Sequence, residues 1–395
     1  MSGSRKGWCP GALRPMRSGD GLIVRLRLSC GELSSAQAHE IAALAGSHGH
    51  GEIDLTARGH LQLRGIDDAA YPSLIESLAA AGLVDASPQV EAVRNVLVTP
   101  FAGFDGPFDV RPCARAWERA LALSPVLWRL PAKFGVSFDA GGFPLGDESD
   151  IRFEAQDGRT FVARLAGGQE VLGPFPKGEL VAVARALTHA FLAVCGEAPR
   201  RMRDAVRAQG LKPFAAAAGL PVAFAPQAPR AAAAADWLGV HALRAHAFAG
   251  VAAPFGRLRS NQLAALADAC GPAGMRLTPW RALLVPGLDQ TTAREFVECA
   301  RGLGLIVDPA DPLLRVAACV GAPACSSALG ETRETARRLA PLAPRGEGIW
   351  LHVSGCAKGC AHPRPAPLTV VASREGYQLN GEAPRSLDAL AERIA

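Results

Sequence analysis

Two segments of this chain, far apart in the sequence, align with each other without a gap. IDLTARGHLQLRGID at residues 53–67 matches MRLTPWRALLVPGLD at residues 275–289, and the same offset of 222 residues continues to residue 84. The identical pairs include Thr56 with Thr278, Leu61 with Leu283, Gly65 with Gly287, and Asp67 with Asp289. A register kept over this length favours duplication over a chance likeness of Ala- and Leu-rich helices. The chain is therefore expected to fold as two related halves.

Each copy is expected to contain a strand, a helix, a second strand and a second helix. LSSAQAHEIAALA at 33–45 resembles LRSNQLAALADAC at 258–270 after a slip of three residues, and both have a helical apolar pattern. This order predicts an α+β, or mixed α/β, fold class in two pseudo-symmetric halves.

Between the copies, two further patterns predict regular structure. Residues 150–168 contain two extended runs joined at Asp157-Gly158, which is typical of a β-hairpin. Residues 177–195 show the apolar spacing of a helix with one buried face. Residues 211–237 are rich in Ala and Pro with few charges, and they are expected to form a linker between the halves.

Four cysteines near the end of the chain stand in two pairs. Cys319 and Cys325 are separated by five residues, and Cys356 and Cys360 by three, in loops of Gly, Ala, Pro and Ser. Small residues let a backbone wrap closely around an iron–sulfur cluster and point N–H groups at sulfur. Paired zinc ligands usually have about two to four residues between them, so the five-residue gap argues against zinc. Structural zinc and four unrelated buried thiols remain alternatives.

Composition limits the compartment and the kind of ligand. The first twenty residues contain no apolar segment of a secretory signal, and no long apolar run follows, so a cytoplasmic protein without a membrane span is expected. In a reducing compartment, ten cysteines do not suggest a disulfide framework. Basic residues are dispersed and only 6% of residues are aromatic, which argues against nucleic-acid binding.

The basic residues are almost all arginine. Of the 42 Lys and Arg residues, only five are Lys, which leaves 37 Arg. Codon bias explains such a skew in a chain rich in Ala, Gly and Pro. The functional interpretation is carboxylate or phosphate binding, because a guanidinium offers a planar bidentate fork that an ammonium lacks.

The cysteine spacing and the repeat together resemble the sulfite/nitrite reductase superfamily. In that superfamily four such cysteines hold a 4Fe-4S cluster, and the last of them, here Cys360, bridges to sirohaem iron. LTARGHLQLRG at 55–65 resembles the segment Thr-x-Arg-x-x-x-Gln, which implies that Arg58 faces an anionic substrate with Gln62 and Arg64 beside it. RNVLVTPFAG at 94–103 and LPAKFGVSF at 130–138 are also similar to family segments, so the resemblance covers most of the chain.

The resemblance implies a sulfite/nitrite reductase-like fold, with a ferredoxin-like repeat and an α/β lobe in each half. The expected units are 1–90 as the first ferredoxin-like repeat, 91–210 as the first α/β lobe, 211–237 as the linker, 238–310 as the second ferredoxin-like repeat, and 311–395 as the iron–sulfur cluster lobe.

Three segments narrow the resemblance to the precorrin-3B synthase family. They are GWCPGALRPMRSGDGLIVRLR at 7–27, HGHGEIDLTARGHLQLRG at 48–65 and SGCAKGCAHP at 354–363. That family implies a monooxygenase of cobalamin biosynthesis, which converts precorrin-3A with dioxygen to precorrin-3B by hydroxylating a meso carbon and closing a γ-lactone. The implied cofactors are a 4Fe-4S cluster and possible mononuclear non-haem iron, with sirohaem less favoured.

The implied substrate is a macrocycle edged with carboxylates, which an arginine collar would orient through bidentate bonds. The candidate catalytic residues are Arg58 and Lys133. The candidate substrate-binding residues are Arg14, Arg17, Arg25, Arg27, Arg58, Gln62, Arg64 and Arg94. Arg25 and Arg27 alternate on an expected strand and so point to one face. A solvated basic face is the alternative for about half of these arginines.

One departure from the reductases bears on the choice of activity. Where they commonly have Leu-Pro-Arg-Lys-Phe, this chain has Ala132 before Lys133. The lost guanidinium favours the oxygenase over a sirohaem-dependent sulfite or nitrite reductase. A non-enzymatic protein with a four-cysteine zinc site is the alternative of another class.

Two requirements of an oxygenase are not visible in the sequence. Non-haem iron is often held by two His and one carboxylate. The candidates near the motifs are His48, His50, His60, His352, His362 and Asp54, but each histidine is more often a hydrogen-bonded core or loop residue, so no ligand is assigned. Cys9 is either a buried apolar residue, which is favoured, or a reactive thiol near the substrate. The chain has no dinucleotide-binding Gly-x-Gly-x-x-Gly, so an external electron donor using NAD(P)H is expected.

Overall fold

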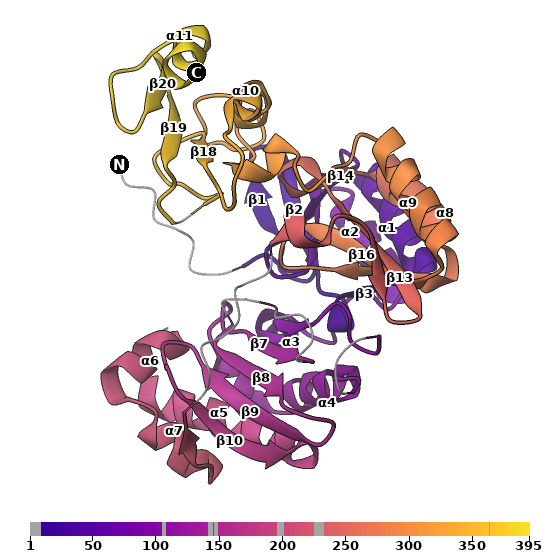
Figure 1. The fold of residues 1–395 in the computed structure, drawn as a ribbon, viewed down its shortest axis with the longest axis vertical. Helices are drawn as coiled ribbons and strands as arrows, with labels where there is room; N and C mark the ends of the chain where they lie inside the picture. Colours follow the sequence, from indigo (N-terminus) through magenta and orange to yellow (C-terminus); the bar gives the residue numbers. More distant parts are fainter. Residues whose placement is uncertain are drawn as a thin grey trace.

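The computed structural model describes residues 9–104, 108–140, 145, 149–195, 201–224, 233–362 and 364–395. Figure 1 shows three parts: two related five-stranded sheets with their helices, a six-stranded lobe at the bottom, and a smaller lobe at the top that ends at the C-terminus. The mixed α+β class predicted from the sequence is confirmed.

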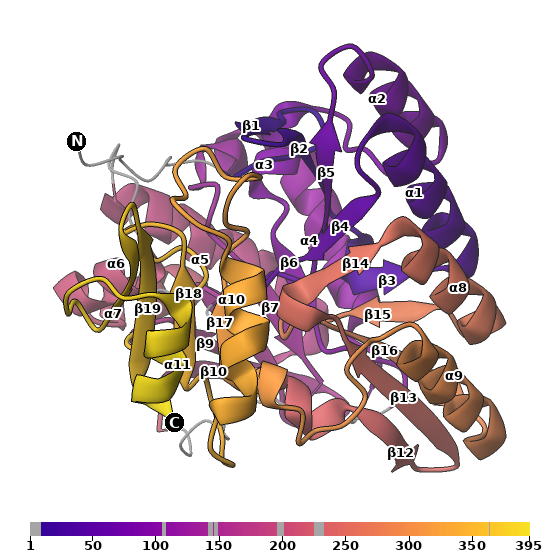
Figure 2. The ribbon, with the colours of Figure 1, turned by 90° about the horizontal axis from the view of Figure 1, so that it is seen from above.

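The two halves exchange edge strands. The first sheet has the order β1 (Met16–Ser18), β2 (Gly21–Leu26), β5 (Leu61–Ile66), β4 (Glu52–Leu55) and β14 (Arg257–Arg259). The second has the order β12 (Gly239–Leu243), β13 (His246–Ala252), β16 (Ala282–Leu288), β15 (Met275–Leu277) and β3 (Glu32–Leu33). Strand β14 of the second half thus completes the first sheet, and β3 of the first half completes the second (Figure 2).

The aligned segments form hairpins, which corrects the expectation of one strand in each. β4 and β5 are antiparallel, as are β15 and β16. The aligned threonines explain why both turns form. Thr56 Oγ1 accepts hydrogen bonds from the backbone N–H of Arg58 (3.3 Å) and His60 (3.1 Å), and Thr278 Oγ1 accepts one from Ala282 (3.2 Å).

The aligned glycines are required by the backbone. Gly65 has φ 67° and Gly287 has φ 80°, and the pairing register shifts in both sheets next to them. A Cβ at Gly65 would lie 2.4 Å from the His50 ring, and one at Gly287 would lie 2.5 Å from the Phe104 ring. A side chain would be strained by both the φ angle and the contact, so both copies keep glycine.

Four helices cover one side of the two sheets. They are α1 (Ser35–His48), α2 (Tyr71–Ala80), α8 (Ser260–Cys270) and α9 (Gln290–Gly302). Ser34 and Gln37 form a capping box at the start of α1. The apolar residues of both halves form a single core, in which Ile53 and Leu63 of the first half are buried with Leu258 and Met275 of the second. The opposite face of each sheet is not covered by these four helices.

The six-stranded lobe lies between the two copies in the sequence. Its order is β11 (Val222–Ala223), β10 (Val171–Pro176), β9 (Thr160–Leu165), β8 (Ile151–Ala155), β7 (Val136–Asp139) and β6 (Val96–Val98). Its helices are α3 (Pro88–Val93), α4 (Arg111–Ala122), α5 (Leu180–Cys195), α6 (Met202–Gln209) and α7 (Lys212–Ala218). The predicted hairpin is present as antiparallel β8 and β9, and the predicted helix as α5.

The expected linker at 211–237 is partly regular structure. Helix α7 and strand β11 lie within it, and Phe214 of α7 is fully buried in the core of the six-stranded lobe. The apolar side chains of this Ala-rich stretch pack against the lobe, so its first part is not a free connection. Residues 225–232 of the expected linker lie outside the described residues.

Helix α5, with the turn before it, is long and apolar enough to cross a membrane by length and composition alone. Its buried residues Leu180, Val183, Leu187 and Phe191 pack inside the core of the six-stranded lobe. Helix α5 therefore packs as a core helix of the six-stranded lobe.

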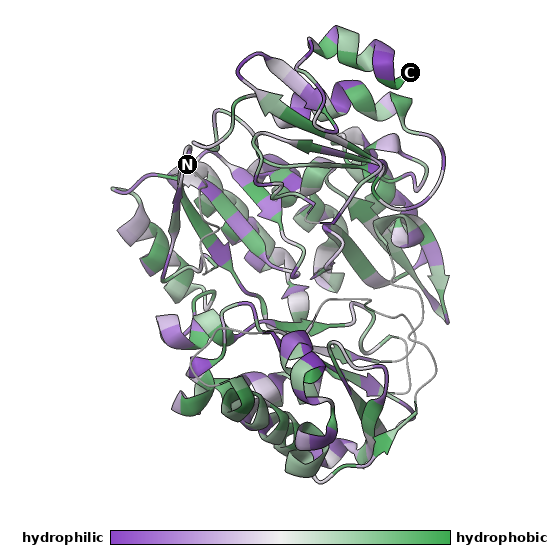
Figure 3. Cartoon of the chain, turned by 90° about the vertical axis from the view of Figure 1, so that its left-hand side faces the viewer, coloured by the Kyte–Doolittle hydropathy of each residue, from purple (hydrophilic) through white to green (hydrophobic). Residues whose placement is uncertain are grey.

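The C-terminal lobe contains a four-stranded sheet in the order β17 (Val316–Ala318), β18 (Leu351–Ser354), β19 (Leu368–Ser373) and β20 (Gly376–Leu379). Its helices are α10 (Thr332–Leu339) and α11 (Leu387–Ile394). Strands β17, β18 and β19 run parallel. Hydrophobic and hydrophilic stripes alternate along α11 in Figure 3, and its Leu390 is buried in the core of the lobe.

Candidate functional site

The first sheet has a polar face opposite its helices. Because side chains alternate along a strand, Val24, Ile53 and Leu63 enter the core, and their neighbours point the other way. Four of these neighbours form a row across β2, β5, β4 and β14, in the order Arg25, Gln62, Asp54 and Arg257. Arg25 Nη2 donates to Gln62 Oε1 (2.9 Å), and Arg257 Nε donates to Asp54 Oδ1 (2.8 Å). We call this surface the polar face.

Asp54 lies at the centre of an arginine cluster on the polar face. Besides Arg257, it contacts Arg64 Nη1 (3.6 Å) and Arg333 Nη2 (3.4 Å), the latter from helix α10 of the C-terminal lobe. Burial alone would raise the pKa of Asp54, but the charges and hydrogen bonds of these arginines lower it below its ordinary value. Arg64 also forms a bidentate pair with Asp20, and Arg257 pairs with Glu52.

Arg257 and Arg333 were missed by the sequence analysis. Arg257 belongs to the second half and reaches the polar face only through the exchange of β14, and Arg333 belongs to another lobe. Arg333 is half-buried, and its buried Nε and Nη1 have no hydrogen-bond partner among the described residues. Burial lowers the pKa of Arg333 to about 10. No local sequence signal separates these two residues from the other arginines.

A second group of polar side chains lies at the other end of the polar face. His60 is 2% exposed and Arg27 is 4% exposed. Neither ring nitrogen of His60 has a hydrogen-bond partner among the described residues, and the same holds for Nε and Nη1 of Arg27 and Nε of Arg25. Burial lowers the pKa of Arg27 to about 10. We call His60, Arg27 and Arg25 the histidine–arginine group.

Cys9 is half-buried and lies close to Arg25. The sequence favoured a buried apolar role for this residue over that of a reactive thiol near the substrate. The structure instead places the thiol at the edge of the histidine–arginine group.

The corresponding face of the second sheet is closed by aromatic side chains. Trp280, which aligns with Arg58, stacks on Trp237 with ring centroids 5.9 Å apart. Leu284, which aligns with Gln62, is buried in one cluster with Phe101 and Phe248. One copy of the duplicated face is therefore filled with apolar side chains, while the other keeps charged and polar ones. This asymmetry makes the polar face of the first sheet the candidate binding surface.

The predicted site residues are not all gathered on the polar face. Gln62 and Arg64 lie on it with Arg25 and Arg27, and Arg58 lies in the β4–β5 turn, where its charge faces Arg25 and His60. The remaining predicted residues lie elsewhere: Arg14 is exposed, Arg17 is exposed and paired with Asp68, and Lys133 is exposed in the loop before β7.

Arg94 is held by acidic neighbours. It donates to Asp85 (2.7 Å), to Glu118 (3.2 Å) and to the carbonyl of Arg27 (2.7 Å). These bonds occupy the guanidinium and fix the segment that carries Arg27. In this structure Arg94 therefore holds the backbone of Arg27, a member of the histidine–arginine group, in position.

The two cysteine pairs lie in neighbouring loops. Cys319 directly follows β17, and Cys356 follows the adjacent parallel strand β18. The two loops touch: Gly355 N–H donates to Cys319 Sγ (3.2 Å), Leu329 N–H to the Gly355 carbonyl (2.8 Å), and Lys358 Nζ to Ser327 Oγ (3.0 Å). We call residues 319–329 and 355–360 the cysteine loops.

The sulfur atoms themselves are not converged. Cys319, Cys325 and Cys356 are half-buried and Cys360 is exposed. Within the ranges that the structure describes, no three His, Cys, Asp or Glu side chains form a group that could hold a metal ion. Four thiols, small neighbours and an N–H aimed at sulfur are the donor set of an iron–sulfur cluster. The fit therefore lies in the residue types and the loop contacts, and the convergence expected from the sequence is not seen.

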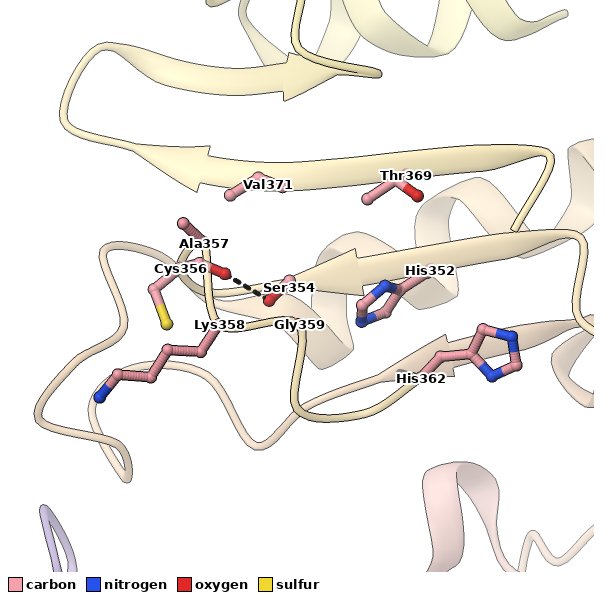
Figure 4. A pocket seen from close by; sticks show the side chains of 9 residues that line it. All are labelled: His352, Ser354, Cys356, Ala357, Lys358, Gly359, His362, Thr369 and Val371. Atoms are coloured by element: carbon pink, nitrogen blue, oxygen red, sulfur yellow. Dashed lines mark hydrogen bonds between the residues drawn. The ribbon is translucent and has the colours of Figure 1, made fainter. Parts of the chain in front are cut away.

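A cavity of about 240 Å³ lies beside the cysteine loops. Figure 4 shows Cys356 and Lys358 at one end and His352 and His362 at the other. The two histidine rings are 6.1 Å apart, and burial lowers the pKa of both. Of the candidate iron ligands, His352 and His362 are thus neighbours. His50 is exposed at a different cavity, His48 lies at the end of α1, and neither groups with Asp54 into a metal site.

A larger cavity, of about 800 Å³, separates the polar face from the first cysteine loop. Its lining includes Asp20, Glu52, Arg257 and Arg259, together with Val320, Ala322, Pro323 and Ala324 of the first cysteine loop. The loop is fastened at one edge, where Ser18 Oγ donates to the Ala324 carbonyl (2.8 Å). The cavity thus lies between charged groups and the cysteine loops.

The buried imidazole of His60 predicts that acid destabilises the protein. Burial lowers the pKa of His60 well below its ordinary 6.5, and so do the facing charges of Arg27, Arg25, Arg58 and Arg94. Below about pH 6.5 the unfolded imidazole binds a proton that the folded one does not, so His60 costs about 1.4 kcal/mol of stability per pH unit.

We expect the free energy of unfolding of the wild type to fall more steeply on acidification than that of His60→Leu. Urea denaturation on both sides of the ordinary histidine pKa measures the difference. Parallel pH profiles of the two proteins would contradict it.

The chain is similar over nearly its whole length to proteins of one superfamily. Residues 14–81 match the nitrite/sulfite reductase ferredoxin-like half domain. The precorrin-3B synthase of Sinorhizobium sp is 33% identical over 97% of this chain and 84% of its own length. The ferredoxin–nitrite reductase of Synechococcus elongatus is 27% identical over 93% of this chain and 80% of its own length.

A solved structure shares the fold. The NirA protein of Mycobacterium tuberculosis superposes with a TM-score of 0.73 at 20% identity, covering 94% of this chain and 79% of that protein. This confirms the fold predicted from the cysteine spacing and the repeat.

Proposed function

Because this chain belongs to the precorrin-3B synthase family of the sulfite/nitrite reductase superfamily, we propose that it converts precorrin-3A to precorrin-3B in cobalamin biosynthesis. The proposed reaction is oxygen-dependent hydroxylation of a meso carbon with closure of a γ-lactone. The chain is an oxidoreductase, as its relatives are. The observation that carries the proposal is the 33% identity to the precorrin-3B synthase of Sinorhizobium sp. The similarity extends over nearly the whole chain, so it includes both copies of the repeat.

The polar face suits a flat ligand edged with carboxylates. Arg58 and Arg25 lie close enough for their charges to interact, and a guanidinium binds a carboxylate through two parallel bonds. Asp54 holds Arg64, Arg257 and Arg333 in place, so these side chains lose little freedom when a ligand arrives. Fixing the ring in one orientation is what selective reaction at one carbon requires.

The cysteine loops would hold a 4Fe-4S cluster through Cys319, Cys325, Cys356 and Cys360. Such a cluster supplies electrons one at a time. The first cysteine loop contacts the sheet that carries the polar face, where Ser18 Oγ donates to the Ala324 carbonyl, so a cluster there would be near the ligand. Mononuclear non-haem iron is part of the proposal without assigned ligands, and sirohaem is less favoured. A separate reductase using NAD(P)H is proposed as the electron donor, and dioxygen as the second substrate.

The test uses protein reconstituted anaerobically with iron and sulfide, and then given precorrin-3A, dioxygen and a reducing system. The expected product has gained oxygen and carries the lactone, which mass spectrometry and NMR detect. Haem-type absorption bands together with nitrite or sulfite reduction, and no precorrin conversion, would contradict the proposal. Iron-free protein with bound zinc would point to the structural metal site instead.

Removing the guanidinium of Arg58 is expected to lower kcat/KM for precorrin-3A by about 100-fold, because a bidentate charged bond is lost. The change is Arg58→Leu, and the matched control is Arg301→Leu, which removes an exposed arginine from α9. Steady-state kinetics of the three proteins measure the effect. Equal kcat/KM values for wild type and Arg58→Leu would exclude a role for Arg58 in binding.

A further inference from the structure

The histidine–arginine group contains more buried hydrogen-bonding capacity than the described residues satisfy. His60 has two ring nitrogens without a partner, Arg27 has two such nitrogens, and Arg25 has one. His60 and Arg27 are almost fully buried. A buried polar atom without a partner costs free energy, so native proteins rarely leave several together. Their grouping indicates that a polar ligand completes them.

The charge around the group indicates that this ligand is an anion. Four guanidiniums face His60, those of Arg25, Arg27, Arg58 and Arg94. The nearby carboxylates are engaged: Asp85 and Glu118 bind Arg94, and Glu91, 3.9 Å from Arg27, accepts the backbone N–H groups of Ala12 and Leu13. A water molecule would satisfy hydrogen bonds but leave the excess positive charge in place.

The repeat gives an independent comparison. The residue that aligns with His60 in the second half is Ala282, which is buried in an apolar cluster with Leu238, Ala252 and Ile306. Where the face is filled, the position holds a methyl group, and where the face is polar, it holds an imidazole. The imidazole is thus found in the copy of the repeat that keeps the polar face.

We propose that His60, Arg27 and Arg25 form a buried subsite for one carboxylate of the ligand, with the His60 ring donating a hydrogen bond to it. The identity of the ligand as a tetrapyrrole rests on the proposed function, whereas the anion subsite rests on the contacts above. A neutral imidazole offers one donor and one acceptor, so a carboxylate can take the donor together with the guanidinium N–H groups. The arriving negative charge also favours protonation of the ring.

The first experiment measures binding of uroporphyrin, a stable macrocycle with acetate and propionate groups, by fluorescence titration. His60→Leu is expected to weaken binding roughly 10- to 100-fold, the effect of one lost bond to a charged group. His60→Gln, which keeps a donor, is expected to recover part of the loss. The control is His241→Leu, in the closed half, where the His241 ring stacks on Phe248; it is expected to bind like the wild type.

The second experiment reads the binding signal in the wild-type protein, and the variant serves only to assign it. In wild-type protein labelled with ¹⁵N at histidine, sodium acetate is expected to shift the ring signals of His60, which are identified by their absence in His60→Gln. If uroporphyrin binds wild type and His60→Leu equally, the subsite is excluded and the proposed function stands. If acetate shifts His60 but uroporphyrin does not bind, the subsite stands and the tetrapyrrole is excluded. If neither is seen, both are excluded.

Discussion

Replacing Asp54 with asparagine is expected to lower the free energy of unfolding by about 3–5 kcal/mol, the cost of leaving buried charges without their partner. Arg64 and Arg257 keep Asp20 and Glu52, whereas Asp54 is the acid with which the structure pairs Arg333. The new amide would be neutral in the middle of three guanidiniums. Urea denaturation followed by circular dichroism measures the change.

The matched control for this prediction is Asp68→Asn. Asp68 also pairs with an arginine, Arg17, but both side chains are well exposed, so solvent already screens the charges. The urea midpoint of Asp68→Asn is expected to equal that of the wild type. If Asp54→Asn is as stable as the control, the arginine cluster does not depend on the aspartate for its charge balance.

Serine in place of Cys356 is expected to abolish the bound iron and labile sulfide, and with them the conversion of precorrin-3A. A hydroxyl is a poor replacement for a thiolate ligand, and Cys356 lies where the second cysteine loop leaves β18. Iron and sulfide analysis after anaerobic purification, with the visible spectrum of the cluster, measures the effect. Circular dichroism reports whether the chain still folds.

Cys299→Ser is the matched control, because Cys299 is also partly exposed but lies on helix α9, away from the cysteine loops. It is expected to keep the iron and sulfide content of the wild type. Retention of a full cluster by Cys356→Ser would remove this cysteine from the ligand set. Zinc in place of iron in both proteins would support a structural metal site.

The sequence predicted the features that depend on local patterns. The hairpin of β8 and β9 and the helix α5 each follow from residues close together in the chain, and the duplication follows from the likeness of two such local patterns. Alternation also predicted that Arg25 and Arg27 would point to one face, and in the structure both belong to the histidine–arginine group. The turn between β4 and β5 was missed, although the aligned threonines that accept its backbone N–H groups were visible.

Features that depend on distant pairing could not be read from the chain. The pairing of β14 with β4 joins residues about 200 positions apart, so Arg257 gave no sign of lying beside Asp54. Arg94 looked like a carboxylate binder by resemblance, yet Asp85 and Glu118 surround it. The ends of α7 were hidden because an Ala-rich segment has little amphipathic contrast, and only the burial of Phe214 shows its packing.

The exchanged strands also protect the protein from self-association. Without β14, strand β4 would present a free row of backbone N–H and carbonyl groups, and without β3 so would β15. Each half thus supplies the strand that pairs with the exposed edge strand of the other half's sheet. A fragment that contains only one copy would leave such an edge strand unpaired, and identical fragments could then pair edge to edge. Because both copies lie in one polypeptide, these edges are paired within the molecule, which disfavours fibrous aggregates.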